Sequence, residues 1–520
     1  MTSFEMQRTS SQPDEEIDDG PATKADIDLV ESACDGGAAT YSESVAAHLP
    51  KVHRDYLLER HGTLDLDPIP GMDPNDPYNW PEWKKMTNLI LVAFHACMGT
   101  FTAACIIPAY ANIAEELGIG MQQVSYLTSI QIAIIGGAPL FWKPLSNRYG
   151  RRPIFLLSLI CSLVCNIGCA KSTTFASVAA CRALVAFFIS PASAIGSAVV
   201  METTFKKDRG RYMGVWTLMI TLGVPIGPFL FGFVTYRAGY HWIYWILAII
   251  NGVQFILYLF LGPETRYVGS KVDRLESSLK TQYLSIRRID PTPLSWYEFV
   301  RPLTMVRHPS IVIPACAYAM VFLFGSILAT VEVPQLLQLK FGLNAEQLGL
   351  QFLGVIIGSV IGEQMGGILS DVWMSRRARR IDRKPEPEFR LWLSYIGFAL
   401  TIIGAIVFLV CTQTSPAGHW SVAPIIGTAI GAVGNQLVTT VMITYAVDCY
   451  PQEAASIGVF ITFVRQIWGF IGPFWFAPMF ETVGIAPSAG VASALVVVAS
   501  VIPTIFLHWR GKIWRRNEGE

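Results

Sequence analysis

Five charged side chains lie inside long apolar stretches of the sequence, where a charge is costly and therefore points to chemistry. They are Arg182, Glu332, Glu363, Asp448 and Arg465. A charge at the centre of a bilayer costs about 2.5 to 3.5 kcal/mol on insertion scales. A carboxyl group in a dry cavity can alternate between protonated and ionised forms, as a proton carrier must. We predict proton-coupling roles for the three acids and for Arg465, with Glu363 first because Gly362 and Gly366 flank it.

Other roles stay open for three of the five. Glu332 precedes Pro334 near a helix end and could face water in an outer vestibule. Asp448 closes its apolar stretch and could cap a helix or pair locally at the membrane surface. Arg465 could bind an anion or a buried carboxylate.

Polar and aromatic residues near the middle of other apolar stretches are candidates for a substrate pocket, although core packing explains each one equally well. They are Gln131, Tyr318, Phe324, Asn435, Gln436 and Trp468. Apolar walls with few polar groups suit an amphipathic organic solute. The sequence shows no nucleophile and base pair, metal-ligand spacing or phosphate loop, so we expect no enzyme, metal, cofactor or ATP-driven pump.

The composition requires a membrane around these residues. Of 520 residues, 52% are apolar and 15% charged, against about 25% charged in ordinary soluble domains. The net charge is zero, so we expect no nucleic-acid partner. Twelve apolar segments have about the 20 residues that a bilayer-spanning helix needs. They lie near residues 88–110, 122–142, 153–171, 176–200, 212–235, 241–262, 310–332, 345–369, 390–411, 420–447, 456–478 and 486–508.

We therefore predict an all-α membrane protein with twelve transmembrane helices in two pseudo-symmetric six-helix bundles. Residues 1–85 are polar and acidic and read as a disordered cytoplasmic tail. The bundles cover residues 86–262 and 310–508, a cytoplasmic loop covers 263–309, and a cytoplasmic tail covers 509–520. Basic residues gather in alternate loops, and the other side holds Lys171, Arg237 and Lys340, so we expect both termini in the cytoplasm.

The two halves repeat each other. Gly214-Val215 matches Gly458-Val459, and Gly227-Pro228-Phe229 matches Gly472-Pro473-Phe474, at a nearly constant separation. Internal symmetry of this kind is typical of secondary transporters, which bind their substrate near the bilayer midplane between repeats.

Three features resemble signatures of the major facilitator superfamily, over residues 75 to 510. They are the basic loop at 143–152, the span-five pattern of Gly223, Gly227, Pro228 and Gly232, and Arg182 in span four. The segment from Asp73 to Lys85, with Pro263-Glu264-Thr265-Arg266-Tyr267, is similar to fungal twelve-spanner drug:proton antiporters of the cycloheximide-resistance type. The resemblance implies proton coupling at Arg182.

The resemblance also implies gating and conformational roles. Such roles fall on Asn147, Arg148, Gly150, Arg151, Arg152, Asp371, Gly223, Gly227, Pro228, Gly472 and Pro473. The family's loop has Asp where this chain has Asn147 and Gly where it has Lys143, which puts a charge-pair latch in the N-terminal half in doubt. Asp371 keeps the acid in the C-terminal half.

From these patterns we expect a monomeric plasma-membrane transporter that exports a small organic compound in exchange for protons. Two alternatives remain. The chain could take up a cation such as a polyamine, bound by Glu332 and Glu363, or it could be a transporter-like nutrient receptor that signals through its tails.

Overall fold

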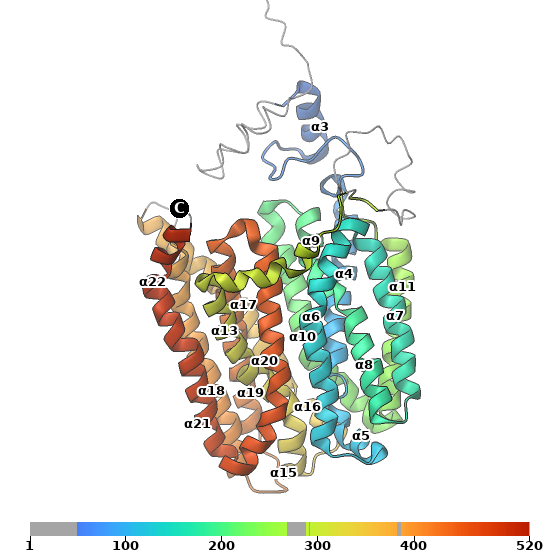
Figure 1. Ribbon diagram of the computed structural model, residues 1–520, viewed down its shortest axis with the longest axis vertical. Coiled ribbons are helices and arrows are strands. Elements are labelled where there is room, and N and C mark those ends of the chain that lie inside the picture. The colour runs from blue at the N-terminus through green and yellow to red at the C-terminus, as the bar shows by residue number, and fades with distance from the viewer. Residues whose placement is uncertain (1–48, 268–287, 291, 382–385, 519–520) are drawn as a thin grey trace, which may run out of the picture.

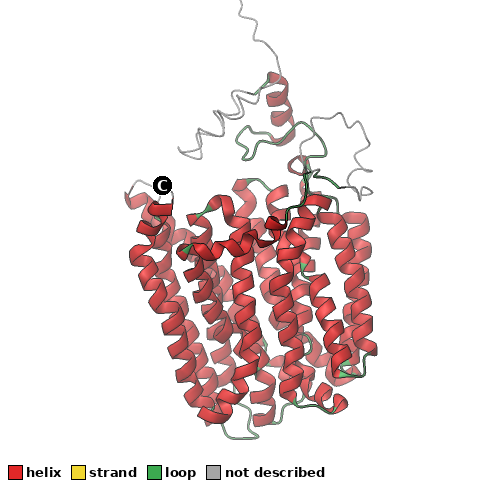
Figure 2. Ribbon diagram, in the orientation of Figure 1, coloured by secondary structure: helices red, strands yellow, loops and turns green. Residues whose placement is uncertain are grey.

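The computed structural model describes residues 49–267, 288–290, 292–381 and 386–518. Helices make up these residues almost completely, and no strand occurs among them (Figure 2). Twelve helical segments are long and apolar enough to cross a membrane, with mean hydropathies from 1.4 to 2.4. The predicted all-α, twelve-span fold is therefore confirmed.

Six of the spans form the N-half. They are α4 (Glu82–Ala104) continued by η2 (Ile107–Ala109) and α5 (Tyr110–Leu117), α6 (Met121–Tyr149), α7 (Arg151–Lys171), α8 (Phe175–Ile189) continued by α9 (Pro191–Thr203), α10 (Lys206–Ala238) and α11 (His241–Leu261). The break between α8 and α9 falls at Pro191, which lacks the N–H that a continuous helix would need.

The other six spans form the C-half. The first is α13 (Pro309–Phe322) with η5 (Leu323–Ile327), α14 (Leu328–Val331), η6 (Pro334–Gln338) and α15 (Leu339–Phe341). The others are α16 (Ala345–Leu350) with α17 (Leu353–Ile381), α18 (Trp392–Thr414), α19 (Ala423–Cys449), α20 (Ala454–Val483), and α21 (Ile485–Val496) with η9 (Val497–Val501) and α22 (Ile502–Glu518). Helix α22 thus continues past the predicted boundary at residue 509.

The internal repeat extends to the turns between spans. Gly239 joins α10 to α11 with φ +86°, and Gly484 joins α20 to α21 with φ +94°. These two glycines have the same separation in the sequence as the repeated Gly-Pro-Phe motifs. Because side chains rarely adopt this backbone conformation, the matching glycines support the internal symmetry of the two halves.

The helical bundle has two ends, which we name by what they carry. The terminal face carries α3 (Lys51–His61), α12 (Trp296–Val300) and the C-terminal end of the chain, and the opposite face carries α5 and α15 (Figure 1). Successive spans run between these faces in alternating directions. The terminal face is also where the basic loop at residues 143–152 lies.

The prediction of a disordered tail over residues 1–85 is wrong for its last part. Residues 1–48 lie outside the described residues, but α3, η1 (Pro77–Asn79) and the chain between them dock on the terminal face of the N-half. Tyr78 donates to the carbonyl of Met201 over 2.7 Å, and Asp67 pairs with Lys206 over 2.9 Å. Trp80 is 4% exposed. These contacts order a segment whose polar composition alone cannot form a core.

Candidate functional site

Three polar side chains meet midway along the helices, where α10 of the N-half faces α17 and α19 of the C-half. The side-chain amide of Gln436 donates to Glu363 Oε2 over 2.8 Å and to Thr221 Oγ1 over 3.2 Å. Gly362 brings α17 close enough, because a Cβ there would lie 2.8 Å from that of Gln436. Glu363 is partly exposed and Gln436 is buried. Gln436 therefore connects an acid of the C-half to the N-half.

A second polar contact lies at a similar depth in the C-half. Arg465 Nη1 donates to the Tyr318 hydroxyl over 2.7 Å, and the guanidinium lies 4.6 Å from the centre of the Phe322 ring. Such stacking is favourable for a cation. Within the described residues, Arg465 Nε is buried and has no hydrogen-bond partner. It can therefore contact a polar or anionic group of a solute.

Arg182 and Gln131 lock together inside the N-half. Arg182 Nη2 donates to Gln131 Oε1 over 2.7 Å, and the amide of Gln131 donates back to the carbonyl of Arg182 over 3.0 Å. Carbonyls of Leu127 and Ala103 accept further bonds from the guanidinium. Since both side chains are 1% exposed, they stabilise the N-half and are closed to a solute in this conformation.

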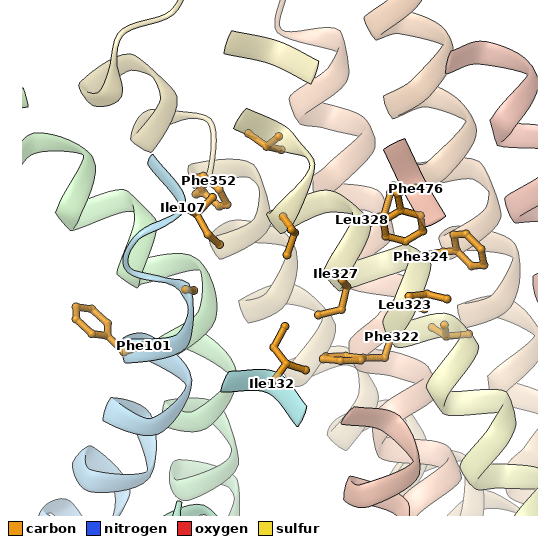
Figure 3. Close-up of a cluster of buried hydrophobic side chains, with 14 of the residues drawn as sticks. Phe101, Ile107, Ile132, Phe322, Leu323, Phe324, Ile327, Leu328, Phe352 and Phe476 are labelled. Atoms are coloured by element: carbon orange, nitrogen blue, oxygen red, sulfur yellow. The ribbon is translucent and has the colours of Figure 1, made fainter. Parts of the chain in front are cut away.

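An apolar plug joins the two halves beside these polar groups. Figure 3 shows Ile132 of α6 pointing toward Phe322 and Ile327 of the C-half. A Cβ at Gly469 of α20 would lie 3.2 Å from Ile132 Cγ2 and 3.0 Å from the Phe322 ring. Packing across the two halves is therefore as close here as within a protein core.

Beyond the plug, the two halves are closed together at what we call the opposite gate, formed by Gln122, Tyr126, Gly232, Gln335, Gly349, Pro473 and Phe474. Gln122 donates to the carbonyl of Pro473 and accepts from Gln335 over 3.1 Å. The rings of Tyr126 and Phe474 stack 4.5 Å apart. A Cβ at Gly232 would lie 2.9 Å from Gly349 Cα, so α10 and α16 touch through their backbones.

Glu332 lies at the end of α14, directly before η6. It is 0% exposed, and neither carboxylate oxygen has a hydrogen-bond partner among the described residues. The prediction that it could face vestibule water is therefore wrong for this conformation, in which the opposite gate is closed over it.

The basic loop of the N-half is held by acids that the sequence reading did not assign. Glu264 accepts from the backbone N–H groups of Arg151 and Arg152 over 2.8 and 3.0 Å, and so caps α7. Burial raises the pKa of the Glu264 carboxyl, and these backbone bonds act against that rise. Glu202 pairs with Arg151 over 2.7 Å. Asn147 accepts a hydrogen bond from Arg151 over 2.8 Å, in place of an ion pair.

The central linker connects the two halves at the terminal face. Arg148 of α6 pairs with Asp290 over 2.5 Å and also with Glu298 of α12. Arg301 of η4 (Arg301–Arg307), which follows α12 directly, pairs with Glu453 at the start of α20. A chain of ion pairs thus runs from α6 through the linker to α20.

Two acids of the C-half near the terminal face, Asp371 and Asp448, differ in their contacts. Asp371 is exposed and has no ion-pair partner among the described residues. Asp448 pairs instead with Arg390 over 3.2 Å at the terminal face, and its side chain is 40% exposed. This position favours the local-pairing alternative for Asp448 over a role in proton coupling at membrane depth.

The remaining pocket candidates differ in their surroundings. Asn435 donates to Gln436 over 3.0 Å and so belongs to the midway cluster. Phe324 is 2% exposed and packs on Trp475 and Phe476 inside the C-half, which is core packing (Figure 3). Trp468 is partly buried against the same core.

The motif glycines divide between two kinds of contact. A Cβ at Gly223 or Gly227 would collide with the backbone of α4 in the same half, whereas Gly232 contacts the other half. Gly472 packs against Leu323. Sequence reading missed Thr221 and Gln122, because a single polar residue in an apolar span carries no signal of what it faces. Glu264 lies in the Pro263-Glu264-Thr265-Arg266-Tyr267 segment, but only the fold brings it beside Gly150 and the basic loop.

Comparison with known proteins agrees with this arrangement. The family model described as Major Facilitator Superfamily matches residues 89–473. An uncharacterised transporter of Schizosaccharomyces pombe is 28% identical, over 85% of this chain and 91% of its own length. The efflux pump radE of Floropilus chiversii is 26% identical over 84% and 82%, and the MFS-type transporter atr4 of Stereocaulon alpinum is 29% identical over 86% and 81%.

The family match covers most of the chain, the curated relatives match along nearly their whole length, and the twelve spans fall into two repeated halves that meet at a polar cluster. The molecule is a multi-pass membrane transporter with a small-molecule substrate, and the chain belongs to the major facilitator superfamily, among its fungal efflux-type members.

Proposed function

We propose that this transporter exports a small amphipathic organic compound in exchange for protons, by alternating access, as a monomer in the plasma membrane with its terminal face in the cytoplasm. Relatives named as efflux pumps support the direction of transport. Basic residues concentrated at the terminal face, such as Arg148, Arg151 and Lys206, support the orientation.

The observation that carries the proposal is the position of Glu363. It is an acid midway along α17, it is partly exposed, and through Gln436 it is hydrogen-bonded to Thr221 of the other half. When ionised, its carboxylate accepts from the Gln436 amide. Protonation removes the charge and weakens this acceptor, which loosens the contact between halves where a substrate would bind.

Substrate would occupy the space beside this cluster. Arg465, Tyr318 and Phe322 offer one cationic and two aromatic surfaces at the same depth. An amphipathic compound can place its ring system on the aromatic side chains and a polar group near Arg465 or Glu363. Protons and substrate then compete through the same few polar groups.

The test begins with a yeast strain that lacks its own drug efflux pumps. The chain is expressed there, and the amphipathic toxin to which it gives the largest resistance becomes the probe. Purified protein in liposomes is then assayed for flux of that toxin with and without an imposed pH gradient. We expect Glu363→Gln to abolish the gradient-driven part of the flux, a loss of tenfold or more.

Glu481→Gln is the control, since it removes an exposed acid from α20 that has no gating role. It should transport like the wild type. Flux that ignores the pH gradient, or a Glu363→Gln variant that still responds to it, would contradict proton coupling at this acid. Accumulation of the probe in intact cells, in place of its export, would reverse the direction proposed here.

A further inference from the structure

We propose that Glu332 is the proton-binding group of the opposite gate, which closes only when the Glu332 carboxyl is protonated. The inference rests on the alternating-access transport proposed above and adds a second acid to it, distinct from Glu363 in place and in role. Glu363 lies midway along the helices beside the substrate space, whereas Glu332 is sealed under the gate.

The enclosure of Glu332 is complete in this conformation. Its side chain is 0% exposed, and both carboxylate oxygens lack a hydrogen-bond partner among the described residues. Its chain neighbours Val331, Val333 and Leu336 are buried apolar residues. An unpaired carboxylate in such surroundings has lost its hydration without compensation, so the closed gate favours the neutral acid.

The gate itself lies one helical turn away. Gln335 of η6 donates to Gln122 of α6, which in turn donates to the carbonyl of Pro473 on α20. Opening the gate must break this bridge and admit water to the turn that carries Glu332. Water can then solvate the ionised Glu332 carboxylate. The open gate therefore no longer favours the protonated acid.

The other titratable groups near Glu332 do not supply a counter-charge. Tyr110, at the junction of η2 and α5, interacts electrostatically with Glu332 and donates its hydroxyl proton to Thr128 over 2.7 Å. Arg182 interacts with the same Tyr110, and its guanidinium donates to Gln131 and to backbone carbonyls. On α16, Glu346 is directed to Arg237 over 3.7 Å at the rim. A proton is therefore the cation that closing requires.

The sign of the pH effect follows from these states. The closed gate binds one more proton than the open gate, so lowering the pH favours closure and raising it favours opening. Linkage of a single proton changes the ratio of closed to open molecules by up to tenfold per pH unit. In an exchanger, protons taken up from the side of the opposite face would thus drive the return of the empty gate to its closed state.

The experiment measures the gate without substrate and without a gradient. Spin labels are attached at Tyr126→Cys and Phe474→Cys, whose rings stack 4.5 Å apart in the closed gate, in a background with the ten native cysteines replaced. Distances between the labels are recorded over a pH series in lipid nanodiscs. We expect the long-distance population of the protein with Glu332 to grow as the pH rises.

Glu332→Gln should stay closed at every pH, and Glu332→Leu serves as a second neutral variant of similar size. Glu481→Gln, which removes an exposed acid from α20, should keep the wild-type response. The proposal is overturned if the long-distance population of the protein with Glu332 does not change with pH. It is also overturned if a neutral variant keeps the full pH response. This experiment measures no transport, so its outcome can be told apart from a failure of the proposed proton-coupled export.

Discussion

Gly232 offers the sharpest test of how the two halves meet. A Cβ on this residue would lie 2.7 Å from the carbonyl oxygen of Ala345 and 2.9 Å from Gly349 Cα. Both are backbone atoms of the other half, so they cannot rotate out of the way. The clash exists only while the opposite gate is closed, and Gly232→Ala should therefore shift the molecule toward the open gate.

The size of the shift follows from the cost of overpacking. Inserting one carbon into a closely packed contact costs about 1 to 3 kcal/mol, which corresponds to a change of about 5- to 150-fold in the equilibrium between two states. Because the clash is absent in the open state, nearly all of this free energy shifts the equilibrium between the closed and the open gate. Folding stability should change little.

The assay is the labelling rate of a single cysteine at Tyr126→Cys by a membrane-impermeant thiol reagent, since the Tyr126 ring is stacked on Phe474 when the gate is closed. Gly214→Ala on the same helix is the matched control, because a Cβ there meets nothing within 4 Å. Equal labelling rates in Gly232→Ala and Gly214→Ala would refute the backbone contact between the halves.

Two further predictions concern stability and complete those made above. Trp80→Ala should lower the free energy of unfolding by about 3 to 5 kcal/mol, because the buried Trp80 anchors the N-terminal segment, whereas Trp83→Ala, at 65% exposure, should change the melting temperature little. Arg182→Lys keeps the charge, but a single ammonium group cannot keep the guanidinium's bonds to Gln131, Leu127 and Ala103 together, so it should melt well below the wild type, while the exposed Arg237→Lys should not.

The sequence determined the architecture because the signals for it are local. A span of about 20 apolar residues is stable in a bilayer whatever the rest of the chain does, and the charges of its flanking loops orient it. The repeat of Gly227-Pro228 in Gly472-Pro473 likewise predicted two halves. Glu363 could be chosen from the sequence for the same reason, since an acid inside an apolar span is conspicuous.

Tertiary structure alone decided which groups meet across the halves. Three features depend on the register of helices that lie far apart in the chain. Gln436 bonds to Thr221, Asp448 rather than Asp371 pairs with Arg390, and Glu332 is enclosed beneath the closed gate. Neither hydropathy nor loop charge changes when one helix rotates or slides against another. The contact energies that fix this register arise only when the two halves pack, so they leave no pattern in either segment by itself.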